Sequence, residues 1–238
     1  MTRLRFGPLL LAALPAALAG AAAAQEAPAI AEPMVFDLVR PLGARRGELE
    51  VNTLAQRNLS GPHRTVEWAP EIEYAFADNM AVELELPFEG RRVTDYKLGL
   101  QGTFGLLNHG RGIHGVQYLG LWNREHRRFQ SSLLYVVGNR FGRDASTLTM
   151  IGVGDVGAAG AETRALLFNH TSFYDLAPAT TAGVEVNLRI GRERATLVMP
   201  QIQQGLGQRI QLQAGLGAAK DEGSAWRPRA GVRLVRQL

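Results

Sequence analysis

A length of 238 residues allows one or two domains, and 46% hydrophobic residues with a formal net charge of +4 are ordinary values for a folded chain. Beyond the N-terminus, no stretch approaches the roughly 20 apolar residues that a transmembrane helix needs. The balanced charge, without interleaved aromatic and basic residues, argues against nucleic-acid binding, and the chain has no cysteine for disulfides. Two classes remain: a soluble β protein, or a membrane β-barrel, whose alternating strands average out hydropathy.

The first 24 residues have the three parts of a secretory signal peptide. Arg3 and Arg5 give a positive start, LLLAALPAAL fills residues 9–18, and small residues precede a cleavage position after Ala24. A retained anchor helix is the alternative, which Pro15 and the alanine-rich ending disfavour. We therefore expect the mature chain to leave the cytoplasm.

Residues 25–46 follow the predicted signal peptide and show no regular alternation. EAPAIAEP, residues 26–33, has the composition of a flexible stretch, and MVFDLVRPLG, residues 34–43, carries apolar residues interrupted by a proline. Two interpretations are open: a disordered lead-in that lies in the periplasm, which the composition favours, or a plug that folds into the lumen of a barrel.

From residue 47 to residue 238, apolar and polar residues alternate in about twelve segments of roughly 9–12 residues, the length of a tilted membrane-spanning strand. In TVEWAPEIEYAF, residues 65–76, nearly every second residue is apolar and glutamates stand between them; RIQLQAGLGA, residues 209–218, repeats the pattern. Segments 112–122, 129–141 and 145–154 alternate poorly, so ten or fourteen strands also fit. The predicted strands are 47–55, 65–77, 79–89, 95–105, 112–122, 129–141, 145–154, 163–174, 181–191, 194–203, 208–218 and 228–238.

A soluble β-sandwich would show the same period of two, so the decision depends on other features. Aromatic residues stand at strand ends on the apolar face, as in the interfacial girdles of membrane barrels; they are Trp68, Phe76, Phe88, Tyr96 and Phe104. The predicted export, the strand length and the even spacing of the segments agree with these aromatic positions. Together they predict an all-β, transmembrane antiparallel up-and-down barrel over residues 47–238, with its apolar face turned to lipid.

Three stretches resemble bacterial outer-membrane barrels of the phenol-degradation MetA-like family: GELEVNTLAQ, WAPEIEYAFADNMAVELELPF and MPQIQQGLGQRIQLQAGLG. The resemblance implies a transporter or porin-like channel of the outer membrane of Gram-negative bacteria, in some members linked to hydrophobic aromatic compounds. It carries no catalytic motif. The chain departs from the usual aromatic last residue, because it ends at Leu238 and Arg236 interrupts the final alternation.

An outward apolar face turns the charged residues inward. Closure of the barrel is expected to bring Arg229 and Arg233 near Glu48 and Glu50. These charges either pair with one another and fill the interior, or form a polarised, water-filled passage. The predicted lumen-lining and solute-contact residues are Glu67, Glu71, Glu73, Glu83, Glu85, Lys97, Glu185, Arg189, Arg209, Arg229 and Arg233.

Carboxylates two residues apart recur on every acidic strand, as a polar lining produces, so we predict no catalytic residue, no metal site and no cofactor. The enzymatic alternative is a lipid hydrolase that uses Ser172 and His170, whose H-x-S spacing is similar to that of outer-membrane phospholipase A and of lipid A deacylases. That pair is expected near the periplasmic end of its strand. A third alternative is a structural or adhesive barrel that acts through the loops AQRNLSGPHR and NREHRR.

The favoured function is passage of small, hydrophobic or aromatic solutes through an outer-membrane barrel. The expected partners are outer-membrane lipid, the barrel-assembly machinery and a small-molecule solute, with no nucleic acid. The oligomeric state and the identity of the solute stay open.

Overall fold

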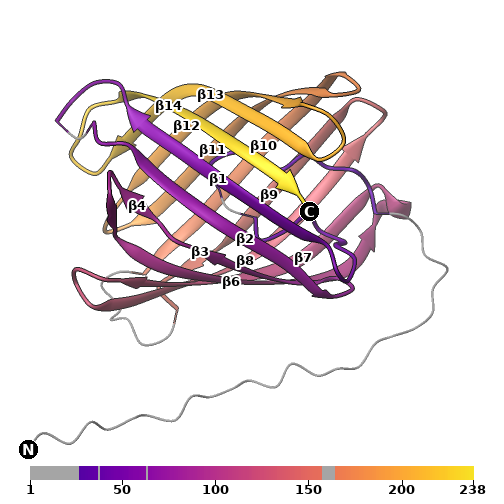
Figure 1. Ribbon diagram of the computed structural model, residues 1–238, viewed down its shortest axis with the longest axis horizontal. Coiled ribbons are helices and arrows are strands. Elements are labelled where there is room, and N and C mark those ends of the chain that lie inside the picture. The colour runs from indigo at the N-terminus through magenta and orange to yellow at the C-terminus, as the bar shows by residue number, and fades with distance from the viewer. Residues whose placement is uncertain (1–26, 37, 63, 157–163) are drawn as a thin grey trace, which may run out of the picture.

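The computed structural model describes residues 27–238 except 37, 63 and 157–163. The predicted signal peptide, residues 1–24, lies outside the described residues. No helix in this part of the chain has the length and apolar character to cross a membrane. Apart from one short 3-10 turn, η1 (Asn108–Gly110), the regular structure is a single antiparallel sheet (Figure 1).

Twelve long strands make up the sheet, and the two-residue strands β4 (Phe88–Glu89) and β5 (Arg92–Val93) extend one hairpin of it. The long strands are β1 (Leu49–Asn58), β2 (Glu67–Ala77), β3 (Met80–Glu85), β6 (Asp95–Leu107), β7 (Gly112–Asn123), β8 (Arg128–Phe141), β9 (Ala145–Gly154), β10 (Ala165–Ala177), β11 (Thr180–Gly191), β12 (Ala195–Gly205), β13 (Ile210–Asp221) and β14 (Arg227–Gln237).

The sheet closes because β1 pairs with both β2 and β14, antiparallel in each case. Figure 1 shows the C-terminus at the end of β14, beside β1. Every long strand lies next to its neighbour in sequence, which is the up-and-down topology. The predicted fold class and the count of about twelve strands are confirmed.

On the strands that alternate clearly, apolar side chains face outward and charged or amide side chains face inward. On β11, Val184 is 45% exposed and the next residue, Glu185, is fully buried; on β13, Leu216 is 62% exposed and Gln213 is fully buried. A soluble sandwich would have the opposite arrangement, because its apolar face forms the core. This inversion is the pattern of a barrel that faces hydrocarbon.

The two ends of the barrel differ in their connections. The end where β1 starts and β14 stops has turns of two to four residues, and we call it the short-turn end. The opposite end, where β1 stops and β14 starts, we call the long-loop end, because its connections include the long one between β3 and β6 that contains β4 and β5. Exposed aromatic side chains lie near both ends; near the short-turn end they are Phe76, Phe104, Phe141 and Tyr174 on strands, and near the long-loop end they are Tyr96, Trp122 and Phe129 on strands and Trp226 just before β14.

Candidate functional site

The described residues of 27–44, a range that we call the luminal segment, lie inside the barrel and contact strands on several sides. Its residues Met34, Leu38 and Val39 are at most 2% exposed. Inward side chains bind its backbone: Gln117 Oε1 accepts the Val39 N–H at 3.0 Å, and Gln101 Nε2 donates to the Arg40 carbonyl at 2.6 Å. The described residues of this segment thus contact inward-facing side chains of the strands.

Glu185, on β11, holds the middle of the luminal segment. Its carboxylate accepts three consecutive backbone N–H groups, from Met34 at 2.9 Å, Val35 at 3.0 Å and Phe36 at 2.5 Å. The side-chain amides of Asn187 and Gln201 donate to the same carboxylate at 2.8 and 3.1 Å. Successive backbone N–H groups form an anion-binding nest, so five neutral donors hold this fully buried charge.

One wall of the lumen, formed by β14, β1, β2, β3 and β6, is charged. Arg40 of the luminal segment reaches this wall, where its guanidinium lies 2.9 Å from Glu50 Oε2 and 3.1 Å from Glu48 Oε2. Arg233 donates to Glu71 Oε1 at 2.7 Å and to Asn52 Oδ1 at 3.1 Å. The charged wall thus holds the segment through Arg40 and links β14 to β1 and β2 through Arg233.

The expected pairing of Arg229 and Arg233 with Glu48 and Glu50 is wrong in register. Arg233 lies opposite Leu54, and Arg229 lies opposite Asn58, at the long-loop end. Strands in a barrel are tilted and staggered, so an inward side chain reaches diagonally rather than straight across. Arg229 therefore pairs with Glu67, Arg233 with Glu71 and Glu73, and the two glutamates near the start of β1 pair with Arg40.

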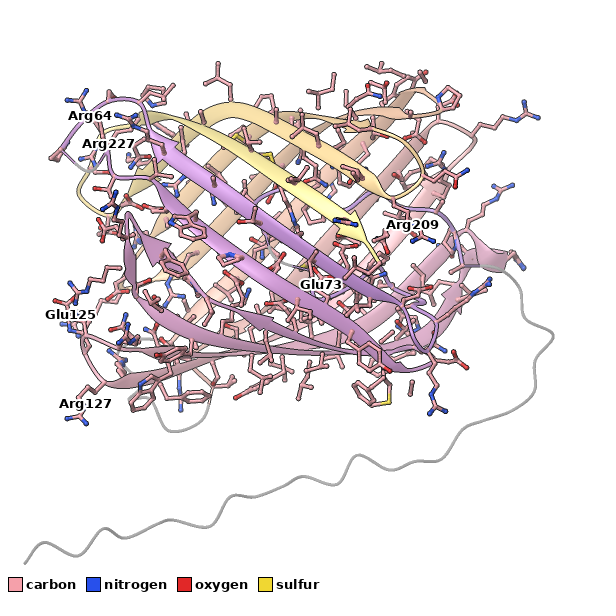
Figure 2. The ribbon with its side chains drawn as sticks, viewed as in Figure 1. Arg64, Glu73, Glu125, Arg127, Arg209 and Arg227 are labelled. Atoms are coloured by element: carbon pink, nitrogen blue, oxygen red, sulfur yellow. The ribbon has the colours of Figure 1, made fainter. Side chains whose placement is uncertain are left out.

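The other predicted lumen residues fall into three groups. Glu83, Glu85 and Lys97 are nearly or fully buried together, with Lys97 Nζ 3.1 Å from Glu83 Oε1 and hydrogen-bonded to Glu85. Arg189 lies at a strand end, 3.5 Å from Asp155. Arg209 is not brought to this site: it is exposed in the turn before β13, and Figure 2 shows it near the short-turn end, apart from Glu73.

The opposite wall, formed by β7 to β10, carries a cluster of apolar inward side chains, which the sequence analysis did not anticipate. These apolar side chains are at most 4% exposed and pack with Leu38 and Leu42 of the luminal segment, beside buried polar residues of the same strands such as Gln117 and Asn169. The segment therefore turns aliphatic side chains to this wall and Arg40 to the charged wall. The wall residues are Ile113, Leu134, Val136, Leu148, Met150 and Phe173.

Glycines on inward positions leave room for the side chains of the luminal segment. A Cβ at Gly99 would lie 2.5 Å from Val39 Cγ2, and one at Gly215 would lie 2.6 Å from Met34 Cε. Real Cβ atoms do not approach that closely, so a larger residue would displace the segment. The inner surface of the barrel is complementary in shape to the segment.

Cavities lie on both sides of the luminal segment. Toward the long-loop end, cavities of about 240 and 280 Å³ share Val35 and Gln56 as lining residues, and a third of about 260 Å³ meets the first at Lys97. Toward the short-turn end, a cavity of about 410 Å³ is lined by residues 27–31 and by strand residues such as Ile113. The segment separates the two regions.

Glu32 is a buried carboxylic acid of the luminal segment. One of its carboxylate oxygens is buried without a hydrogen-bond partner. Burial raises the pKa of Glu32 from 4.5 to about 7, repulsion by Glu50 adds to the rise, and Arg233 and Arg40 oppose it. Because the seated segment holds this proton more tightly than a released one, seating is favoured as pH falls from about 7 to 4.5.

Three carboxylates of the charged wall lie close enough to share a cation. Oxygen atoms of Glu71, Glu83 and Glu85 are all within 4.8 Å of one another. The ammonium of Lys97 contacts two of them and Arg233 contacts the third, so these side chains already supply positive charge there. The arrangement fits a polar lining better than a dedicated metal centre.

His170 and Ser172 do form a hydrogen bond, of 3.1 Å from Nε2 to Oγ, and Thr149 Oγ1 lies 2.8 Å from His170 Nδ1. The expected position near the end of the strand is wrong, because β10 runs from Ala165 to Ala177 and His170 lies near its middle. Ser172 is exposed and alternates with buried Thr171 and Phe173, so the pair faces outward, away from the lumen.

Comparisons with known proteins support the fold. The COG4313 outer membrane channel from Pseudomonas putida F1 has a TM-score of 0.64 at 14% identity, and the match covers 85% of this chain and 100% of that one. The chain has the fold of an outer-membrane β-barrel. A chain solved in a study of in-meso crystallization of membrane proteins has a TM-score of 0.56 at 8% identity, over 80% of this chain and 84% of that one. No curated protein matches the sequence.

A family described as HAEPLYID-like matches residues 29–103. Read as one-letter codes, that name coincides at four positions with IAEPMVFD, residues 30–37, at Ala31, Glu32, Pro33 and Asp37. The match therefore includes much of the luminal segment together with β1, β2, β3 and most of β6. The resemblance to the phenol-degradation MetA-like family stays a prediction.

Proposed function

We propose that this protein is an outer-membrane channel for small solutes, and that the luminal segment is its plug. One observation carries the proposal: the luminal segment separates cavities that lie on its two sides. Hydrogen bonds from side chains of the strands hold the segment in place, and its described residues do not pair with the sheet. Removal of such a segment would leave the strand ladder intact, because β1 to β14 pair without it. A passage then opens between the charged and the apolar wall.

In this proposal, the short-turn end lies in the periplasm and the long-loop end outside the cell, as in bacterial outer-membrane barrels. Residues 1–24 direct export, the barrel-assembly machinery inserts the chain, and lipid surrounds the outward face. The apolar wall of β7 to β10 favours solutes with hydrophobic or aromatic groups, because these groups lose contact with water against it.

The proposal predicts a conductance that depends on the luminal segment. The mature chain, reconstituted in planar bilayers, is expected to be mostly closed, and deletion of residues 27–44 is expected to produce steady ion conductance. Gly99→Leu provides a second route to release, because a side chain there overlaps Val39. Gly102→Leu is the matched control, since a Cβ at Gly102, on the same strand, has open space around it. If correctly folded Gly99→Leu and deleted chains both stay silent, the channel proposal is wrong.

A further inference from the structure

The middle of the barrel contains more buried carboxylates than cations. Six glutamates of the strands have side chains that are at most 10% exposed, whereas the described strands bring two cations, Lys97 and Arg233, to the same region. At the two mouths, by contrast, arginines form ion pairs with single carboxylates, as in Arg229–Glu67 and Arg140–Asp175. The six are Glu50, Glu71, Glu73, Glu83, Glu85 and Glu185.

Glu83 shows where positive charge is lacking. Its side chain is fully buried, and Oε2 has no hydrogen-bond partner among the described residues. Lys97 Nζ lies 3.1 Å from Oε1, but the same ammonium also pairs with Glu85. A buried carboxylate oxygen without a partner is costly, and a further cation in the lumen would lower that cost.

The luminal segment supplies one positive charge to this region, next to an aliphatic surface. The Arg40 guanidinium is 2% exposed and lies 2.9 Å from Glu50 Oε2 and 3.7 Å from Glu73 Oε2. Leu38 and Leu42, two residues to either side, pack in the cluster on the apolar wall. One short stretch thus offers a cation to one wall and an aliphatic surface to the other.

We infer that the passage selects small organic cations that carry an apolar body, and that Arg40 with its neighbours occupies the place of such a solute when the channel is closed. This inference rests on the proposed function. Walls lined by one sign of charge concentrate ions of the opposite sign, and carboxylate-lined constrictions favour cations. An apolar group on the cation can also pack against the apolar cluster of β7 to β10. A simple inorganic cation has no such group and gains no binding free energy there.

The test compares two permanently charged solutes with the same ring, benzyltrimethylammonium and benzenesulfonate, in liposomes that contain the Gly99→Leu channel at pH 7. We expect benzyltrimethylammonium to pass at least about tenfold faster than benzenesulfonate. Tetramethylammonium, which lacks the ring, should compete less well for passage. Adding Glu50→Gln and Glu73→Gln should reduce the preference, and Glu89→Gln, at an exposed position of β4, should leave it unchanged.

The outcomes separate this inference from the proposed function. Passage of neither solute, with no ion conductance, contradicts the channel itself. Passage of both solutes at similar rates, or faster passage of benzenesulfonate, leaves the channel standing and overturns the selection of cations. Selection for benzyltrimethylammonium that survives the double glutamine substitution would show that Glu50 and Glu73 are not the site of recognition.

Discussion

Arg233→Met is expected to lower the free energy of unfolding of the barrel by about 3–5 kcal/mol, because it leaves two buried carboxylates without their partner. Arg233 lies 2.7 Å from Glu71 Oε1 and 3.4 Å from Glu73 Oε1, and its side chain is 2% exposed. It also donates to Asn52 and to the Pro33 carbonyl, so it joins β14, β1, β2 and the luminal segment. Urea titration in detergent or lipid, followed by tryptophan fluorescence, measures the change.

Arg229→Met is the matched control for this prediction. Arg229 stands four residues earlier on the same strand and pairs with Glu67, whose side chain is 51% exposed. Water can replace that partner, so the expected loss is about 1 kcal/mol or less. Equal losses of unfolding free energy in the two variants would show that the buried ion pairs of Arg233 stabilise the barrel no more than the exposed Arg229–Glu67 pair at the mouth.

Glu185→Ala is expected to release the luminal segment while the barrel stays folded. The substitution leaves the N–H groups of Met34, Val35 and Phe36 without their acceptor in a place that water reaches poorly. Loss of several charge-assisted hydrogen bonds costs about 3 kcal/mol or more, which corresponds to a roughly hundredfold shift toward the released state. The channel proposal then also requires raised conductance.

The release can be measured with one introduced thiol, because the chain has no cysteine of its own. Val39→Cys places it at a position that is fully buried in the seated segment. In the Glu185→Ala background, a maleimide reagent should react with it about a hundred times faster. Asn187→Ala, which removes a single donor to Glu185, should change the rate little. An unchanged rate in Glu185→Ala would mean that the nest does not hold the segment.

The strands were predictable from sequence where the two faces differ in polarity, as on β2, β11 and β13. The poor alternation of β7, β8 and β9 has a physical cause in the structure. On β8, Leu133 is 44% exposed and the next residue, Leu134, is fully buried. Both are apolar because one faces outward and the other packs in the cluster that includes Leu38. A strand with an apolar environment on each side has no period of two.

The inward direction of charged side chains within the strands, such as Glu73 and Arg233, was predictable because parity fixes which face they take, whereas Arg209 lies in a turn outside the alternation. The partners of these strand side chains were not predictable, since pairing depends on the stagger of the closed barrel; Arg233 reaches Glu71 rather than Glu50 for this reason. Arg40 was missed as a site residue because it lies before the first alternating segment. One signal was present: an arginine between Leu38 and Leu42 needs both an apolar and a charged surface.

The inside-out arrangement of the barrel can be tested most directly by nitroxide labels placed one at a time at residues 210–216 of β13 in lipid. Accessibility to dissolved oxygen, which concentrates in hydrocarbon, should alternate along the strand. The maxima should fall at Ile210, Leu212 and Leu216 and the minima at Gln211 and Gln213. Maximal oxygen accessibility at the glutamines, or no alternation at all, would mean that the apolar side chains lie in a protein core and that the chain does not form a membrane barrel.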